Sequence, residues 1–403
     1  MIENVVIPFV KIAVVIGGLM TAAAYFVLLE RWIAAWVQDR KGPNRVGIPF
    51  TKISLFGLGQ PAADGIKMIF KENYTPAHVD RALYITAPIV ILSAALAIFA
   101  VIPFGAQLPA GIPGVQGAVD LVVAPNIDVG MVYVFALSSI AVYGVILGAW
   151  ASNNKYSFLG GLRSSAQLIA YEIPMGLGIL GVVLCTGSMR LETIMQKQAE
   201  TGLWNAFTQP LGMLVFVVAA FAEAARLPFD LPECEQELIG GYHTEYAGMK
   251  LLLFLVGEFL HMITAAFLIV ILYFGGWHCW GLTSDATSVG WSEALIRVAV
   301  LMTKIFLVIV FFMIVRWSWP RFRFDQLMAL AWKVMLPLGL INLVAVAVLA
   351  ELGHTGKIGT PLLVGIGWAT MIGSWILAAV VAPLHDENRP QPAAQLFDSE
   401  REL

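Results

Sequence analysis

Six carboxylates and a single arginine lie between residues 222 and 248, in the sequence AEAARLPFDLPECEQELIGGYHTEYAG, which separates two long apolar segments. Two carboxylates about 6 Å apart repel by roughly 3 kcal/mol at an effective dielectric constant near 20, so a partly buried set cannot all stay ionised. Such a cluster can take up and release protons when its surroundings change, which predicts a proton-handling site. A solvated acidic loop is the alternative interpretation.

The composition indicates that lipid is the main solvent of the chain. Hydrophobic residues make up 59% of the 403 residues and charged residues only 13%. These values predict a polytopic membrane protein, and the weak alternating signal of a closed barrel is absent, so we expect an all-α helix bundle. We expect one transmembrane domain over residues 1–384, with the first apolar run retained as a helix, and a polar, disordered C-terminal tail over 385–403.

Nine apolar runs are long enough to cross about 30 Å of hydrocarbon. They lie near residues 5–29, 82–103, 129–151, 165–189, 203–222, 251–275, 294–315, 334–350 and 360–384. Alternating the loops about these runs puts 15 Lys and Arg on one side and three on the other. The positive-inside rule then places the basic side in the cytoplasm and the N-terminus outside. The loops 38–81, 152–164, 223–250 and 316–333 all face the cytoplasm in this topology.

Two glutamates inside the apolar runs are further candidates for proton chemistry. Glu172 and Glu258 each lie about two turns from the cytoplasmic end of their predicted helix. Ionisable groups at such depth usually face a bundle interior or a hydrated cavity, where they mark proton paths. A buried, hydrogen-bonded carboxyl with a structural role is the alternative. Lys304, in the seventh run, is either a counter-charge or a side chain that reaches towards the headgroups.

Basic and aromatic residues occur together in two of the predicted cytoplasmic loops, 38–81 and 316–333. Residues 38–47, QDRKGPNRVG, have the composition of a tight turn, and residues 53–70 have the pattern of an interfacial helix on which Asp64 and Lys67 share a face. An anchoring helix with an ordinary surface ion pair is the alternative. The loop 316–333 is typical of a headgroup belt, or of the rim of an opening for an amphiphile such as an isoprenoid quinone.

The sequence gives no indication of a resident metal or haem. Cys185, Cys234 and Cys279 are isolated, so we infer neither a disulfide framework nor a metal site. His261 is the only histidine within an apolar run, so a haem held by two histidines from spanning helices is not expected. We expect no nucleic-acid partner.

Several motifs resemble those of the H subunit of proton-pumping NADH:quinone oxidoreductase, respiratory complex I, equivalent to the first mitochondrially encoded core subunit. They are RKGPNRVG at 40–47, AADGIKMIFKE at 62–72, PFDLPE at 228–233, GYHTEYAGMK at 241–250 and PRFRFDQLM at 320–328. Their order and spacing match the family over roughly residues 15–345. The resemblance implies a subunit at the heel of the membrane arm. Its cytoplasmic loops would dock the peripheral arm, its helices would contact neighbouring membrane-arm subunits, and it would form much of the quinone chamber.

The resemblance also implies site residues. Six charged residues would line the quinone passage: Glu30, Arg31, Arg40, Asp64, Lys67 and Arg316. Six acids would form the loop beside it: Glu223, Asp230, Glu233, Glu235, Glu237 and Glu245. Glu172 and Glu258 would lead protons towards the antiporter-like subunits. No catalytic residue, metal, haem or flavin is expected in this chain, and NADH, FMN and the iron–sulfur clusters would belong to partner subunits.

These inferences predict lateral entry of a quinone between the first span, the interfacial helix and the seventh span, in a bacterial plasma membrane rather than a mitochondrial one. Many members of the family end after eight spans, so residues 360–384 predict an additional ninth span. A stand-alone proton or cation transporter and the related subunit of an energy-converting hydrogenase are the alternatives. The transporter would be active as an isolated chain, and the hydrogenase relative would have no quinone requirement.

Overall fold

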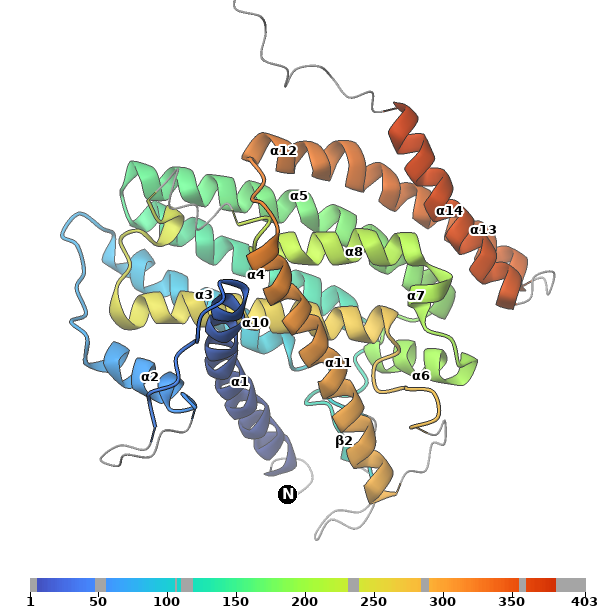
Figure 1. The fold of residues 1–403 in the computed structure, drawn as a ribbon, viewed down its shortest axis with the longest axis horizontal. Coiled ribbons are helices and arrows are strands. Elements are labelled where there is room, and N and C mark those ends of the chain that lie inside the picture. Colours follow the sequence, from blue (N-terminus) through green and yellow to red (C-terminus); the bar gives the residue numbers. More distant parts are fainter. Residues whose placement is uncertain are drawn as a thin grey trace, which may run out of the picture.

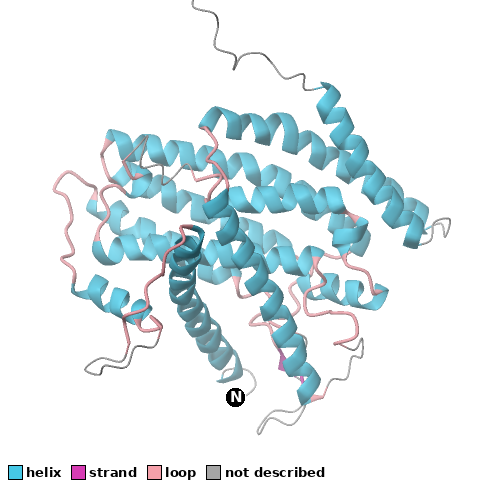
Figure 2. Ribbon diagram, in the orientation of Figure 1, coloured by secondary structure: helices cyan, strands magenta, loops and turns pink. Residues whose placement is uncertain are grey.

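The chain folds into a bundle of helices (Figures 1 and 2) in the computed structural model, which describes residues 6–47, 56–105, 107–109, 119–230, 239–283, 290–354 and 360–381. The elements up to the middle of the chain are α1 (Ile7–Val37), α2 (Gln60–Phe70), α3 (Arg81–Ile98), the two-residue antiparallel strands β1 (Gln107–Leu108) and β2 (Val119–Asp120), α4 (Gly130–Ala151) and α5 (Lys155–Thr186). The remaining elements are α6 (Leu191–Thr201), α7 (Asn205–Thr208), α8 (Pro210–Glu223), η2 (Gly241–His243), α10 (Gly248–Tyr273), α11 (Trp291–Ser318), α12 (Phe324–Ala329), η3 (Leu330–Met335), α13 (Leu336–His354) and α14 (Thr360–Val381).

The helices confirm an all-α polytopic bundle. Seven described helices are long and apolar enough to cross a membrane: α1, α3, α4, α5, α10, α11 and the continuous segment Phe324–Leu352. Two shorter apolar helices, Pro210–Glu223 and Pro361–Leu377, correspond to the predicted fifth and ninth spans. The predicted tail, 385–403, lies outside the described residues.

The fifth span is interrupted. The four-residue helix α7 ends before Gln209, whose backbone is not helical, and α8 begins at Pro210. Proline is well suited to the first turn of a helix because its missing N–H has no partner there in any case. At 14 residues α8 is only about 21 Å long, which is less than the hydrocarbon thickness of about 30 Å.

Local signals set the ends of the helices that position the site. The carboxylate of Asp80 accepts from the N–H groups of Ala82 and Leu83 and so caps α3. The side chain of Asn154 accepts from the N–H of Tyr156 and caps α5, which ends at Gly187 in the left-handed conformation. The helix α5 therefore begins ten residues before the apolar run at 165–189, and it continues without interruption through Pro174.

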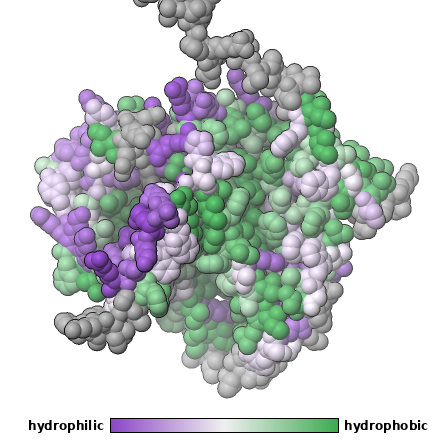
Figure 3. Space-filling model, viewed as in Figure 1, coloured by the Kyte–Doolittle hydropathy of each residue, from purple (hydrophilic) through white to green (hydrophobic). Residues whose placement is uncertain are grey.

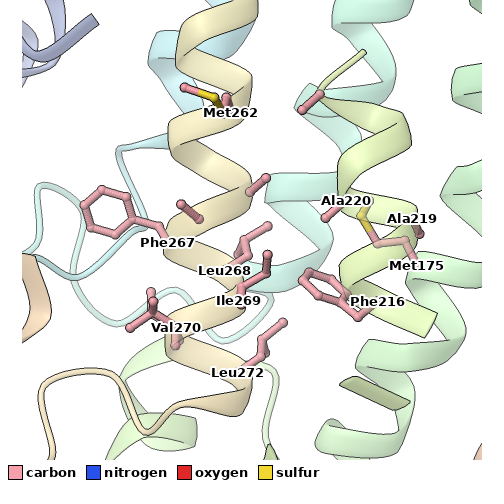
Figure 4. Close-up of a cluster of buried hydrophobic side chains, with 14 of the residues drawn as sticks. Met175, Phe216, Ala219, Ala220, Met262, Phe267, Leu268, Ile269, Val270 and Leu272 are labelled. Carbon is pink, nitrogen blue, oxygen red and sulfur yellow. The ribbon is translucent and has the colours of Figure 1, made fainter. Parts of the chain in front are cut away.

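The core lies where α5, α8 and α10 pack together. In Figure 4, Leu268, Ile269 and Leu272 on α10 point towards Phe216 on α8. The helices α1 and α11 run obliquely to α5, α8 and α10 in Figure 1, and they contact α10 and each other. Apolar residues cover much of the face in Figure 3, and hydrophilic residues gather over the end of α1 and over α2. This arrangement suits a bundle whose sides face lipid and whose polar groups collect at one end.

Candidate functional site

A large cavity opens between the ends of α1 and α11, the loop 40–46 and α10. Its volume is about 930 Å³, and apolar side chains such as Val27, Leu255 and Phe259 line it together with charged ones. Six basic residues face it, namely Arg31, Arg40, Lys41, Arg45, Arg226 and Arg316, against the carboxylates of Glu30 and Glu258. The cavity has the size of a ligand site, and its positive charge favours an electron-rich or anionic group.

Glu30 is the central charge in the wall of this cavity. It is buried, with 8% of its surface exposed. One carboxylate oxygen forms an ion pair with the guanidinium of Arg316, and the other lies 3.7 Å from Nη1 of Arg226. Arg226 is itself buried and lies over the ring of Phe259, with 4.3 Å between the guanidinium carbon and the ring centroid. Glu30 therefore ties α1 to α11 and to the segment that follows α8.

The interfacial helix α2 is tied to α1 by a second ion pair. Nη1 of Arg31 lies 2.7 Å from Oδ2 of Asp64, and the other oxygen of Asp64 accepts from Nε2 of Gln60 at 2.9 Å. Arg31 and Gln60 both line the large cavity. Lys67 is exposed on α2 and is not part of the lining. The exposed apolar side chains of α2 include Ile66, Ile69 and Phe70, as expected for a helix at the membrane surface.

A second, smaller cavity lies deeper in the bundle, and it contains the acids. Its volume is about 50 Å³, and Glu172, Glu223, Glu258 and His261 line it. A site for one water molecule needs roughly 10–15 Å³, so this space is large enough for several water molecules. Glu258 lines this small cavity and the large one. A single carboxylate thus lies between the two spaces.

Each of the three carboxylates in the small cavity accepts a hydrogen bond from a hydroxyl group. Ser138 donates to Glu223 and Ser139 donates to Glu172, so two neighbouring residues of α4 hold acids on α8 and α5. The hydroxyl of Tyr242 donates to Oε1 of Glu258 at 2.7 Å. Hydroxyl groups both donate and accept, so they can hold a carboxylate in either protonation state.

The segment that carries Tyr242 is held against α5. Oγ of Ser157 donates to the carbonyl oxygen of Tyr242 at 2.8 Å. A Cβ atom on Gly160 would lie only 2.6 Å from Cα of Gly241, so the absence of a side chain at Gly160 permits this close approach. The position of Tyr242, and with it the hydrogen bond to Glu258, therefore depends on α5.

Two acids of the loop 223–250 lie outside both cavities. Asp230 is 3% exposed, and its Oδ2 lies 3.4 Å from Nη2 of Arg321. Glu245 accepts from Nδ2 of Asn154 at 2.7 Å and lies 3.9 Å from Nε2 of His78. These contacts fasten the loop to α5 and to the segments around it. Glu233, Glu235 and Glu237 lie outside the described residues.

Comparison with known proteins places these residues in a family. The family model described as NADH dehydrogenase matches residues 10–347. The H subunit of the NADH-quinone oxidoreductase of Flavobacterium johnsoniae is 43% identical over 335 residues, which are 83% of this chain and 92% of that protein. The first of the numbered H subunits of Geobacter metallireducens is 45% identical over 340 residues, 84% of this chain and 95% of that protein.

This chain belongs to the family of NADH-quinone oxidoreductase H subunits. It is therefore a multi-pass membrane component of an oxidoreductase complex, with other subunits of that complex as its partners. A relative from Rhodothermus marinus, NADH-quinone oxidoreductase subunit 8, is 41% identical over 83% of this chain and 94% of its own length. The family match ends before α14, which is consistent with an additional last helix in this chain.

The structure brings most of the predicted site residues together. Four residues that the resemblance assigns to a quinone passage line the large cavity: Glu30, Arg31, Arg40 and Arg316. Asp64 reaches it through Arg31 and Gln60, whereas Lys67 does not face it. Three of the acids assigned to proton transfer, Glu172, Glu223 and Glu258, share the small cavity.

The predicted distance between Glu172 and the start of its helix was wrong. The sequence placed it two turns into its helix, but α5 begins at Lys155, so Glu172 lies about 25 Å along the helix axis. Lys304, which the sequence left undecided, donates to the carbonyl oxygens of Phe274, Gly276 and His278 at 2.7, 3.0 and 2.5 Å. It therefore caps the end of α10, where a cation is favoured by the helix dipole.

Sequence reasoning assigned no site role to several residues that complete the site. Ser138, Ser139 and Tyr242 bind the three acids, and His261 lines the small cavity. The pair of neighbouring serines in an apolar helix was a usable signal, because a hydroxyl in a membrane helix needs a partner. Tyr242 gave no such signal. Among the described residues there is no group of three or more His, Cys, Asp or Glu that could hold a metal ion.

Proposed function

We propose that this subunit forms much of the quinone chamber of NADH-quinone oxidoreductase and couples quinone reduction to proton translocation through a chain of carboxylates. The observation that carries the proposal is the position of Glu258, whose side chain lines both the large charged cavity and the small cavity of acids. A proton can then be exchanged between the two spaces at one residue.

The large cavity suits an amphiphilic quinone. Apolar residues of α1 and α10, including Val27 and Leu255, would contact the isoprenoid tail, and basic residues would attract the carbonyl oxygens of the head. The ion pairs of Glu30 and of Asp64 keep Arg316 and Arg31 in the wall, so that these cations are fixed before the substrate arrives. The passage would open to lipid between α1, α2 and α11.

Reduction of a quinone to a quinol takes up two electrons and two protons. In this proposal the electrons come from the iron–sulfur clusters of partner subunits, which receive them from NADH through FMN, and the protons are drawn from groups that face the head. Loss or gain of charge in the large cavity would change the proton occupancy of Glu258, because charges interact strongly in a medium of low dielectric constant.

The small cavity would carry that change further into the bundle. Glu172 and Glu223 lie in the same small space as Glu258, each held by a serine hydroxyl, and water in this space would connect them. Tyr242 would hold Glu258 in place during the exchange. The acids of the loop, Asp230 and Glu245 together with Glu233, Glu235 and Glu237, would set the charge beside the chamber.

The subunit would have a fixed orientation in the membrane and partners on two of its sides. The basic loops would face the cytoplasm of a bacterium, with the N-terminus outside the plasma membrane. The quinone-module subunits of the peripheral arm would dock on the cytoplasmic loops, and neighbouring membrane-arm subunits would receive protons laterally. The two alternatives from the sequence, a stand-alone transporter and a hydrogenase subunit, gain no support from relatives that are named as subunits of NADH-quinone oxidoreductase.

The test is Glu258→Gln in the intact complex, with Glu200→Gln as the control. Glu200 is an exposed acid on α6 that lines neither cavity. We expect Glu258→Gln to lower NADH:quinone reductase activity and proton pumping together by about a hundredfold, the lower end of the typical contribution of a proton-transferring side chain. The control should retain both. If the Glu258→Gln complex is assembled, reduces quinone and pumps protons at wild-type rates, the relay is wrong.

A further inference from the structure

We propose that an apolar layer around Phe216 is a proton barrier, which separates the cavities of acids from a second buried polar cluster at the far end of α5 and α8. The far end is the one at which α5 ends and α8 begins, away from Glu30 on α1 and from Tyr242 in η2. This inference rests on the proposed relay, because only protons held in the small cavity would need such a barrier.

The near side of the layer is a continuation of the acid site. Beyond the small cavity lies a further space of about 10 Å³, lined by Glu223 and His261 at one end and by Met175, Phe216 and Leu268 at the other. Ser138 also lines both spaces. The polar lining ends where these three apolar side chains meet.

The layer itself is closely packed. Phe216 is fully buried, and Met175 and Leu268 are 2% and 3% exposed. Figure 4 shows them converging from three helices, with Met175 on α5, Phe216 on α8 and Leu268 on α10. The carboxylate of Glu223 and the ring of Phe216 lie on the same helix, about 10 Å apart along its axis. Constrictions of this kind exclude water and so stop ions and protons.

The far side of the layer begins at the hydroxyl of Tyr273. This hydroxyl donates to the carbonyl oxygen of Gly178 at 3.2 Å. A Cβ atom on Gly178 would lie 3.3 Å from the hydroxyl of Tyr273 and 3.2 Å from Cβ of Phe216. Phe216 is thus the immediate neighbour of the first polar group on the far side.

One turn further along α5 lies the second polar cluster, formed by Gln209 and Asn342. Both side chains are 2% exposed. Nε2 of Gln209 donates to the carbonyl oxygen of Gly181 and to Sγ of Cys185, which is exposed. A Cβ atom on Gly181 would lie 2.8 Å from Oε1 of Gln209 and 2.9 Å from Nδ2 of Asn342, so both amide groups lie against α5 at Gly181.

These two amide atoms need a partner. Within the described residues, neither Oε1 of Gln209 nor Nδ2 of Asn342 has a hydrogen-bond partner. Buried polar atoms without a protein partner commonly hold ordered water. The cluster lies at the break between α7 and α8 and continues to Cys185, so polar groups extend from the end of α5 to within one turn of Gly178, whose carbonyl oxygen accepts from Tyr273.

The barrier is therefore about one side chain thick. If water replaced Phe216, the acid cavities and the Gln209–Asn342 cluster would join, and protons would cross the subunit instead of leaving laterally. The apolar layer prevents this loss, which gives Phe216 a function that packing alone does not require.

The barrier is tested by measuring passive proton flux in the intact complex. Wild-type and Phe216→Ser complexes are reconstituted into liposomes with an entrapped pH-sensitive dye, and a pH gradient is imposed in the absence of NADH and quinone. We expect proton flux to rise by roughly tenfold or more in Phe216→Ser, since each ~1.4 kcal/mol removed from a barrier is a factor of ten in rate. Phe216→Leu keeps an apolar side chain and should remain as tight as wild type.

A double variant tests the far-side route. In Phe216→Ser combined with Asn342→Leu, the leak should fall back towards the wild-type rate because the polar cluster is removed. If Phe216→Ser does not assemble, Leu268→Ser breaches the same layer from α10 and should leak in the same way. An assembled Phe216→Ser or Leu268→Ser complex with the same passive proton flux as wild type would overturn the inference. So would a leak that is unchanged when Asn342→Leu is added.

The outcome is separable from that of the relay, because this flux is measured without turnover. A tight Phe216→Ser complex together with inactive Glu258→Gln would remove the barrier and leave the relay. A leaky Phe216→Ser complex together with fully active Glu258→Gln would show that the barrier exists and that the relay does not run through Glu258.

Discussion

The glycine at position 160 provides a test of how strictly the acid site depends on helix packing. A Cβ atom there would lie 2.6 Å from Cα and 2.7 Å from the carbonyl carbon of Gly241, and 2.9 Å from the nitrogen of Tyr242. All three neighbours are backbone atoms, which cannot rotate away as a side chain can. An ordinary contact begins at 3.4 Å, so Gly160→Ala would push the segment 241–242 away from α5 by about 1 Å, at a cost of about 1–3 kcal/mol for overpacking.

A displacement of this size would break the hydrogen bond that Tyr242 donates to Glu258. The bond would lengthen from 2.7 Å to about 3.7 Å, beyond the range of a hydrogen bond. A hydrogen bond to a charged group contributes about 1.5–3 kcal/mol, which corresponds to a change of roughly ten- to a hundredfold in an equilibrium. We therefore expect NADH:quinone reductase activity and proton pumping to fall by about tenfold or more, although Gly160 touches neither cavity.

The assay compares turnover and pumping of the assembled complex with those of a matched variant. Gly176 lies on the same helix, and a Cβ atom there would meet nothing within 4 Å, so Gly176→Ala should behave as wild type. A structure of the Gly160→Ala complex would report the distance from Tyr242 to Glu258 directly. Wild-type turnover in an assembled Gly160→Ala complex with that distance unchanged would refute the reasoning.

Two further predictions concern stability. Lys304→Met removes a cation that donates to three carbonyl oxygens at the end of α10, so we expect the free energy of unfolding to fall by about 3 kcal/mol. The measurement is the midpoint for thermal inactivation of the complex, which should be lower. An unchanged midpoint would contradict the capping role. In Gly367→Val the new Cβ would lie 2.3 Å from the carbonyl oxygen of Thr208, which should displace α14 from α7 and lower the same midpoint at unchanged quinone turnover. Gly373→Val, where a Cβ would meet nothing within 4 Å, is the control, and equal midpoints for the two variants would show that α14 does not depend on this contact.

Hydropathy predicted the helices well because lipid requires long apolar segments with all backbone groups paired internally. It did not predict where α5 begins, since residues 155–164 are helical but too polar to resemble a span. Hydropathy reports the solvent around a segment, whereas a cap such as Asn154 fixes the start of the helix. The break at Gln209 was missed for the same reason, because the apolar composition continues across it.

The site was predictable in its charges and not in its contacts. Glu30 and Arg316 were identified through family motifs, but their contact joins residues far apart in the sequence and follows only from the packing of α1 against α11. Acids inside apolar helices were recognisable because they are rare there. Their hydroxyl partners were not, since serine and tyrosine are common at many kinds of position. The sequence predicts that Lys67 and Asp64 share a helix face. In the structure only Asp64 contacts Arg31, whereas Lys67 is exposed.

The length of α5 has a mechanical consequence. Its 32 residues make a rod about 48 Å long, while the hydrocarbon layer is about 30 Å thick, so the rod must lean steeply or stand clear of the lipid. It meets Tyr242 near one end and Gln209 near the other. A partner that pushed on one exposed end of α5 would tilt the whole helix as a lever. A small displacement of that end would then move the opposite end in the other direction.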